Sequence, residues 1–351
     1  MQDSTRILLN QYLEDQAALN GVDPDAARSG KAFTISNQFA AGTPSVQQRL
    51  IDKQQEETGF LGAINIVLVD EMKGEKLGLG VSGPLASRTQ TNVNGSAGRK
   101  TTDISAVDVE GYECRKTNSD THITYAKLDM WAKFSDFQTR ISNLIRQRQA
   151  LDRIMIGFNG VSAAANTDKV ANPLLQDVNI GWLQKYRDNR PQAVLTAGAT
   201  AGKVRIKASG GGDYRNIHSL VMDATHNLMP AWARNDPSLV AILGDDLQHD
   251  VFFPLIDGEN KPTEMIAADL ILGAKRIGGK QPARAPFMLP KSLFITSLKN
   301  LSIYEQSGKR RRTVREDPDF DCVRTFESTN DDYVVEDYDY GCLVENIEFE
   351  A

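Results

Sequence analysis

The stretch GLGVSG at residues 78–83 has the G-x-G-x-x-G spacing with which many enzymes bind a dinucleotide. In such sites the pyrophosphate binds to the N–H groups of a helix that opens directly on the glycines. An apolar run at 64–69 could supply the strand that comes before them. However, Pro84 follows Gly83, and residues 84–103 show no helical periodicity. We therefore keep a nucleotide-binding enzyme that uses this segment only as an alternative.

Other residue types that could carry chemistry are scattered along the chain. The histidines form no H-E-x-x-H pair or triad-like group, and Cys114, Cys322 and Cys342 form no C-x-x-C pair. A P-loop is absent, because Gly308-Lys309 continues into Arg310. The sequence therefore predicts no catalytic residue, no cofactor and no metal site, and we expect a protein that is not an enzyme.

Two charged clusters call for an interpretation. Lys309, Arg310, Arg311 and Arg312 form a basic run without interleaved aromatic residues, which single-strand nucleic-acid platforms usually have. This run is a candidate charged interface, either with phosphate in a DNA-binding module or with an acidic neighbour. The acidic run at 331–341 lacks the spacing of a calcium-binding loop, so we interpret it as a solvated acidic edge.

The bulk properties narrow the class of protein further. The chain has 351 residues and a net charge of −6, which argues against broad adhesion to DNA phosphates. It contains no apolar run of roughly 18 residues, as a membrane span requires, and its first residues do not resemble a signal peptide. We expect a cytosolic product with no membrane partner.

Two elements in the first half of the chain dominate its expected architecture. Strand-like residues at 64–69 and 112–125 enclose a polar, glycine-rich excursion, which predicts an extended two-stranded projection. A long helix is predicted from residue 136 to about 158, because its apolar residues recur at helical spacing. We expect the arginines on the opposite face of this helix, Arg153 among them, to be solvated.

The second half reads as a compact mixed domain. A Gly/Ala/Thr-rich interruption at 191–212 suggests a boundary, and a helix is predicted at 217–228. Strands are predicted at 238–244 and 292–298, and mostly short strands follow residue 300. An amphipathic helix is predicted at 4–20.

Seven long blocks of this sequence resemble the major capsid protein of the peduoviruses, the P2-like tailed phages. The blocks run in the family's order and cover nearly the whole chain: EMKGEKLGLGVSGPLASRT, LDMWAKFSDFQTRI, IGFNGVSAA, NPLLQDVNIGWLQKYR, GGGDYRNIHSLVMDATHNL, LKNLSIY and STNDDYVVEDYDYGCLVENI. The resemblance implies an α+β fold, the tailed-phage major capsid fold of the Hong Kong ninety-seven type. It implies these parts: an N-terminal arm (1–60), an extended loop with its flanking strands (61–125), a peripheral domain (126–212) with a spine helix (135–159), an axial domain (213–298) and C-terminal strands that complete the peripheral domain (299–351).

The resemblance also implies what the protein does. Copies of the chain would self-assemble as pentamers and hexamers into an icosahedral shell around double-stranded phage DNA, without sequence-specific binding. Further partners would be a scaffolding protein that doubles as the maturation protease and a portal protein at one vertex. The place would be the virion capsid, assembled in the host bacterial cytoplasm.

Three sets of residues are candidates for assembly functions. The arm would either be trimmed within 26–34 or stay uncut and ordered, and the candidate cleavage region contains Lys31, Ala32 and Phe33. The candidate extended-loop residues are Lys73, Gly74, Gly78, Gly80 and Gly83, where the absence of side chains in a strand-like stretch permits a close approach or a bend. The basic run at 309–312 is the third set. We predict no covalent crosslink between subunits.

Overall fold

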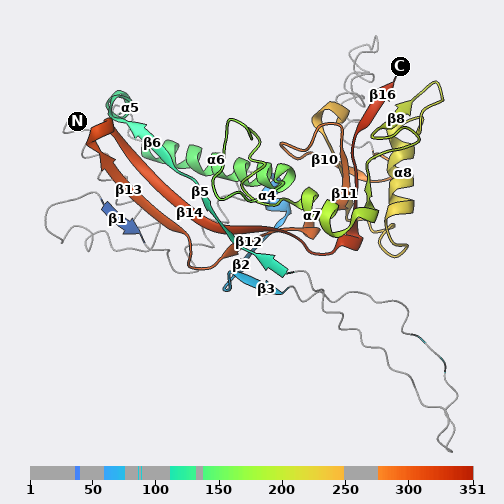
Figure 1. The fold of residues 1–351 in the computed structure, drawn as a ribbon, viewed down its shortest axis with the longest axis horizontal. Coiled ribbons are helices and arrows are strands. Elements are labelled where there is room, and N and C mark those ends of the chain that lie inside the picture. The colour runs from blue at the N-terminus through green and yellow to red at the C-terminus, as the bar shows by residue number, and fades with distance from the viewer. Residues whose placement is uncertain are drawn as a thin grey trace, which may run out of the picture.

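The computed structural model describes residues 36–39, 59–75, 86, 88, 111–131, 137–248 and 276–350, and for 36–39, 131 and 137–139 it describes the backbone only. The described part is elongated, with a seven-stranded sheet toward one end and a five-stranded sheet toward the other (Figure 1). No helix within these ranges is long and apolar enough to cross a membrane.

The larger sheet is built around one long strand. Its order is β1-β13-β14-β12-β2, and β5 and β6 also pair with the long strand β14. The strands are β1 (Ser36–Phe39), β2 (Asn65–Val69), β5 (Arg115–Asn118), β6 (Thr121–Thr124), β12 (Leu301–Gln306), β13 (Arg311–Asp317) and β14 (Cys322–Val335). The expectation of mostly short strands after residue 300 is wrong for β14, which has 14 residues.

The predicted long helix is present as α6 (Phe137–Asn159), which runs along the seven-stranded sheet (Figure 1). A second helix, α7 (Trp182–Asn189), places Trp182 between α6 and β14. The Trp182 ring lies 5.4 Å from that of Phe158 and 5.5 Å from that of Tyr333. Gly157 leaves the space that this ring occupies, because a Cβ there would overlap its atoms. The aromatic contacts therefore fix α6 and α7 on the sheet.

The smaller sheet has the order β10-β9-β11-β15-β7. Its strands are β7 (Val194–Leu195), β9 (Leu239–Leu243), β10 (Gln281–Ala283), β11 (Leu293–Ser297) and β15 (Gly341–Val344). The predicted helix at 217–228 is confirmed as α8 (Ile217–Leu228), and the strands predicted near 238–244 and 292–298 are confirmed as β9 and β11.

Two short strands lie in the stretch that the sequence marked as an interruption. β7 enters the five-stranded sheet beside β15, and β8 (Val204–Lys207) pairs in parallel with β16 (Ile347–Glu350). The C-terminal part of the chain contributes strands to both large sheets: β14 lies in the seven-stranded sheet and β15 in the five-stranded sheet. The predicted helix at 4–20 lies outside the described residues.

The remaining elements are short. A two-stranded ribbon consists of β3 (Lys73–Glu75) and β4 (Gly111–Glu113). The short helices are α4 (Gly59–Ala63) and α5 (Tyr125–Trp131). The described 3₁₀ turns are η1 (Pro191–Ala193), η2 (Leu298–Asn300), η3 (Pro318–Phe320) and η4 (Tyr338–Tyr340).

Candidate assembly site

The base of the expected extended loop is a narrow antiparallel ribbon. Lys73 pairs with Glu113, Gly74 with Tyr112, and Glu75 with Gly111. The structure thus places Lys73 and Gly74 in this short ribbon, and their role in an extended loop stays a prediction. Gly78, Gly80 and Gly83 lie outside the described residues, as do Lys31, Ala32 and Phe33 of the candidate cleavage region.

Gly74 lies directly against an aromatic neighbour. A Cβ built on Gly74 would lie 2.7 Å from the Tyr112 hydroxyl oxygen and 2.8 Å from two atoms of its ring. The same ring makes an edge contact with Tyr304 of β12, with centroids 5.1 Å apart. Tyr112 therefore packs against the large sheet, and a side chain at 74 would have to displace its ring.

Asp332 fastens the ribbon to the body of the protein. Its carboxylate accepts a hydrogen bond from the backbone N–H of Glu113 at 3.1 Å, and both of its oxygens lie 2.9 Å from Nζ of Lys185. Asp332 is buried. The interpretation of the acidic run at 331–341 as a solvated edge is therefore wrong at its start. Asp331 and Asp332 are buried, and each forms an ion pair with a basic side chain.

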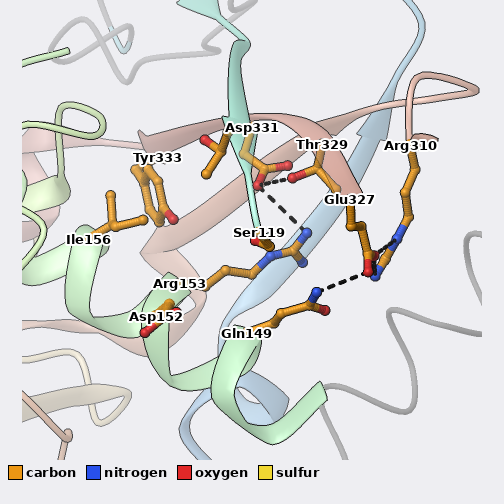
Figure 2. A pocket seen from close by; sticks show the side chains of 11 residues that line it. Ser119, Gln149, Asp152, Arg153, Ile156, Arg310, Glu327, Thr329, Asp331 and Tyr333 are labelled. Carbon is orange, nitrogen blue, oxygen red and sulfur yellow. Dashed lines mark hydrogen bonds and ion pairs between the residues drawn. The ribbon is translucent and has the colours of Figure 1, made fainter. Parts of the chain in front are cut away.

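A second correction concerns the basic face of the long helix. Arg153 is buried rather than solvated, and its guanidinium lies 2.6 Å from a carboxylate oxygen of Glu305 and 3.6 Å from one of Asp331. The three charges come from α6, β12 and β14, and Figure 2 shows Arg153 and Asp331 pointing toward each other. A buried charge without a partner is costly, so these residues specify how the helix sits on the sheet.

The basic run at 309–312 divides into two pairs. Arg310 and Arg312 turn inward: Nε of Arg310 donates to Glu327 at 2.8 Å, and Nε of Arg312 lies 4.0 Å from the other carboxylate oxygen. Gln149 of α6 donates to the same carboxylate at 3.0 Å. Lys309 and Arg311 are exposed. Half of the run is thus exposed at the surface, and its role as an interface stays a prediction.

These buried contacts shift the pKa values of the carboxyl groups in opposite directions. Burial alone would raise the pKa of Glu327, but the guanidinium groups of Arg310 and Arg312 outweigh burial and lower it to about 2. Burial raises the pKa of Asp331, and Arg153 opposes this shift only in part. Glu327 therefore stays deprotonated down to low pH, whereas Asp331 holds its proton more tightly than an exposed aspartate.

A cavity of about 30 Å³ lies between the helix and the sheet beside these charges (Figure 2). This volume is of the size of one or two water molecules, far below that of a nucleotide. Its lining consists of Thr117, Ser119, Gln149, Asp152, Arg153, Ile156, Arg310, Glu327, Thr329, Asp331 and Tyr333. The cavity is consistent with a structural role of this charge cluster.

The histidines and cysteines of the described ranges do not converge on a site. Nδ1 of the half-buried His218 accepts a hydrogen bond from the backbone N–H of Gly278 at 3.0 Å, so this nitrogen is satisfied within the fold. The three cysteines are buried and unbridged, and burial raises the pKa of Cys114 and of Cys342 to about 12. Within these ranges no group of three or more potential metal ligands occurs.

Comparisons with known proteins agree over almost the full length of the chain. Residues 8–347 match the family model described as "Phage major capsid protein, P2 family". The chain belongs to this family. It is 46% identical to the "Capsid proteins" of Escherichia phage P2, with 99% of this chain and 95% of the relative covered. It is 40% identical to the "Major capsid protein" of Serratia phage KSP20, with 99% and 98% covered.

A solved structure extends the agreement to the fold. A chain of the satellite phage P4 procapsid, which was solved with a size determination protein, has 42% sequence identity and a TM-score of 0.79, with 100% of this chain and 99% of that chain covered. The α+β tailed-phage capsid fold expected from the resemblance is confirmed. This P2-family member is a major capsid protein of the virion shell rather than an enzyme, and the nucleotide-binding alternative gains no support.

Sequence reasoning missed the buried charges of this capsid protein. Glu305, Glu327 and Asp331 occupy strand positions where burial is expected for apolar residues. Along β14 the residues that face α6 include Glu327, Thr329 and Asp331, so alternation of polar and apolar residues gives no signal there. Glu305 pairs with Arg153, 152 positions away in the sequence, and Glu327 pairs with Arg310, 17 positions away. No local sequence pattern can reveal such pairs.

Proposed function

We propose that this capsid protein assembles as pentamers and hexamers, which close an icosahedral shell around double-stranded DNA. The observation that carries this proposal is the ribbon base, where Gly74, Tyr112 and Asp332 hold two strands firmly against the body. A projection that is attached to the body in this way can transmit force between neighbouring copies of the chain. The chain between the strands, residues 76–110, would then lie over an adjacent subunit.

The proposal assigns separate parts of the subunit to separate contacts. The seven-stranded sheet with α6 would be the peripheral domain, and the five-stranded sheet with α8 would be the axial domain at the capsomer axis. On this division the end of the chain serves both domains, since β14 and β15 lie in different sheets. A portal protein would replace one pentamer, and the DNA would be enclosed without sequence-specific contacts.

The N-terminal arm would be trimmed during maturation by a scaffolding protein that is also a protease. We place the cut in the region of Lys31, Ala32 and Phe33, directly before β1. Since β1 pairs with β13, a cut at this point would leave the new N-terminus attached to the large sheet. Mass spectrometry of the N-terminus in mature particles tests the cut, and an intact Met1 end would refute it.

Substitution of the loop glycines tests the assembly proposal itself. Gly78→Val and Gly80→Val should impair shell closure while the subunit stays soluble and folded. Gly74→Val should do so more strongly, because its side chain would displace Tyr112. Electron microscopy of the chain expressed with the head genes of its phage gives the readout. If all three variants form shells of normal diameter, the ribbon does not have this role.

A further inference from the structure

The tip of the β13–β14 hairpin exposes an aromatic side chain. The turn η3 joins the two strands, and Phe320 at its end is 68% exposed. The hairpin reaches one extreme of the described molecule, far from the five-stranded sheet (Figure 1). Single exposed apolar residues are common, but this one lies at an end of the molecule that the other described elements leave open.

The tip is held in place although it contributes little to the core. The guanidinium carbon of Arg324 lies 4.6 Å from the centre of the Phe320 ring, and Nε of the same arginine lies 3.0 Å from Asp317. Tyr125 of α5 donates its backbone N–H to the Asp321 carbonyl at 2.9 Å and its hydroxyl to Glu316 at 2.8 Å. A rigid, exposed aromatic residue loses little entropy on binding, which is typical of an interface anchor.

The two ends of this hairpin carry opposite charges. Asp319 and Asp321 flank Phe320 and are exposed, and in the described part of the chain neither forms an ion pair through its carboxylate. Lys309 and Arg311 are exposed at the opposite end, where Arg311 pairs with Ser328. Seven register pairs separate the two ends, or about 20 Å at the rise of an antiparallel strand. Within one copy the two ends cannot meet.

We infer that the hairpin tip docks on the basic end of the same hairpin in a second copy of this chain. Phe320 would be the apolar anchor, and Asp319 and Asp321 would face Lys309 and Arg311 of the second copy. A contact of this kind joins two different patches, so it can close into a ring of copies. The acidic flanks disfavour nucleic acid as the occupant. The inference rests on the proposed assembly and names one contact within it.

Charge reversal and charge exchange test this contact with the full chain, expressed with the head genes of its phage. Asp319→Lys/Asp321→Lys and Lys309→Glu/Arg311→Glu should each lower the yield of sedimenting shells at least tenfold, because each sets like charges against each other across the contact. The variant that carries all four changes should recover most of the yield. Asp245→Lys/Asp246→Lys, two exposed acids near the small sheet, is the matched control and should keep its yield.

Each other pattern overturns the inference. Normal shells from both reversal variants would refute the contact and leave the proposed function intact. If the shell yield falls in both reversal variants and does not recover in the variant with all four changes, the two ends touch different partners. An equal loss in the control would show that net charge matters rather than position. No shells from the unmodified chain would refute the proposed function and the contact together.

Disulfide trapping tests the same contact by proximity. The three natural cysteines are buried, so added surface cysteines dominate the oxidation. In assembled shells, Phe320→Cys combined with Arg311→Cys should give a ladder of linked chains on a non-reducing gel, and neither single variant should give one. Dimers from Phe320→Cys alone would indicate a contact between two tips and would overturn the inference, as would the absence of any ladder.

Discussion

The two sheets of this capsid protein bury their inner faces in different ways. In the five-stranded sheet all residues of β11 and β15 are buried, and Phe294, Ile295 and Leu343 are completely enclosed. In the seven-stranded sheet the face toward α6 buries Glu305, Glu327 and Asp331 against arginines. One sheet is organised by apolar packing, and the other combines apolar packing with paired charges.

The difference follows from what covers each sheet. The main apolar core extends over the small sheet and the part of the large sheet near Trp182. Toward the hairpin end, the described residues form a separate, small cluster with Leu128, Val314 and Val323 as its buried apolar members. The charged residues lie between these two apolar regions. Buried ion pairs add little net stability, but a wrong partner leaves a charge unpaired, so they restrict the ways in which the layers can fit.

The largest expected effect comes from breaking the charged contact. Glu327→Leu removes the carboxylate that serves both Arg310 and Arg312, so buried guanidinium charge is left without its anion. We expect a loss of about 3–5 kcal/mol in the free energy of unfolding, measured by urea denaturation of unassembled subunits. A loss below about 1 kcal/mol, as for surface pairs, would mean that this region behaves like exposed surface.

A double variant serves as the control for that measurement. Glu327→Leu/Arg310→Met replaces the closest ion pair by two apolar side chains. Since such replacements are often neutral, we expect it to be more stable than Glu327→Leu alone. If the second change makes the protein less stable still, the charge of Arg310 has a purpose other than pairing with Glu327.

The contact between α6 and α7, where the apolar packing adjoins the charged region, should be the next most sensitive to substitution. Gly157→Ala puts a methyl group against the Trp182 ring, which is completely buried and cannot move aside freely. Overpacking of this kind costs about 1–3 kcal/mol, and alanine's higher helix propensity offsets part of it. Gly59→Ala is the matched control, because a Cβ at Gly59 has no neighbour within 4 Å. Thermal unfolding of the two variants gives the comparison, and an equal stability of both would contradict it.

The same contrast explains how far the sequence could predict this molecule. Helical spacing in 137–159 and 217–228 and the apolar runs at 239–243 and 293–297 report local burial, so α6, α8, β9 and β11 could be predicted. Family resemblance supplied the overall architecture. Arg153 and the acidic residues of β14 could not be assigned, because a charged residue reads as solvated until its distant partner is known. Of the candidate site residues, Arg310 and Arg312 turn inward for the same reason.

The charged region should also give the protein a distinctive dependence of stability on pH. The folded-state pKa of Asp331 is raised, so folding binds its proton and the free energy of unfolding rises as the pH falls from about 8 to about 5. The pKa of Glu327 is lowered to about 2, so its contribution is lost as the pH falls below its ordinary value of 4.5. Asp331→Asn should remove the rise, on the order of 1–2 kcal/mol, and retain the acid loss. Denaturation curves at several pH values decide this, and an unchanged rise in Asp331→Asn would assign it to another group.

The smallest expected effect lies in the apolar sheet. Ile295→Val removes one methyl group from a completely buried position in β11, next to β9 and β15. We expect a loss of about 0.5–1.5 kcal/mol. Neither neighbouring strand presents a charge to this side chain, so the loss should be the same at about pH 8 and about pH 5, whereas variants of Asp331 differ between the two. Urea denaturation at both pH values measures this. A pH-dependent loss in Ile295→Val would mean that the two sheets are coupled through the core they share, and the contrast between them would then be one of degree.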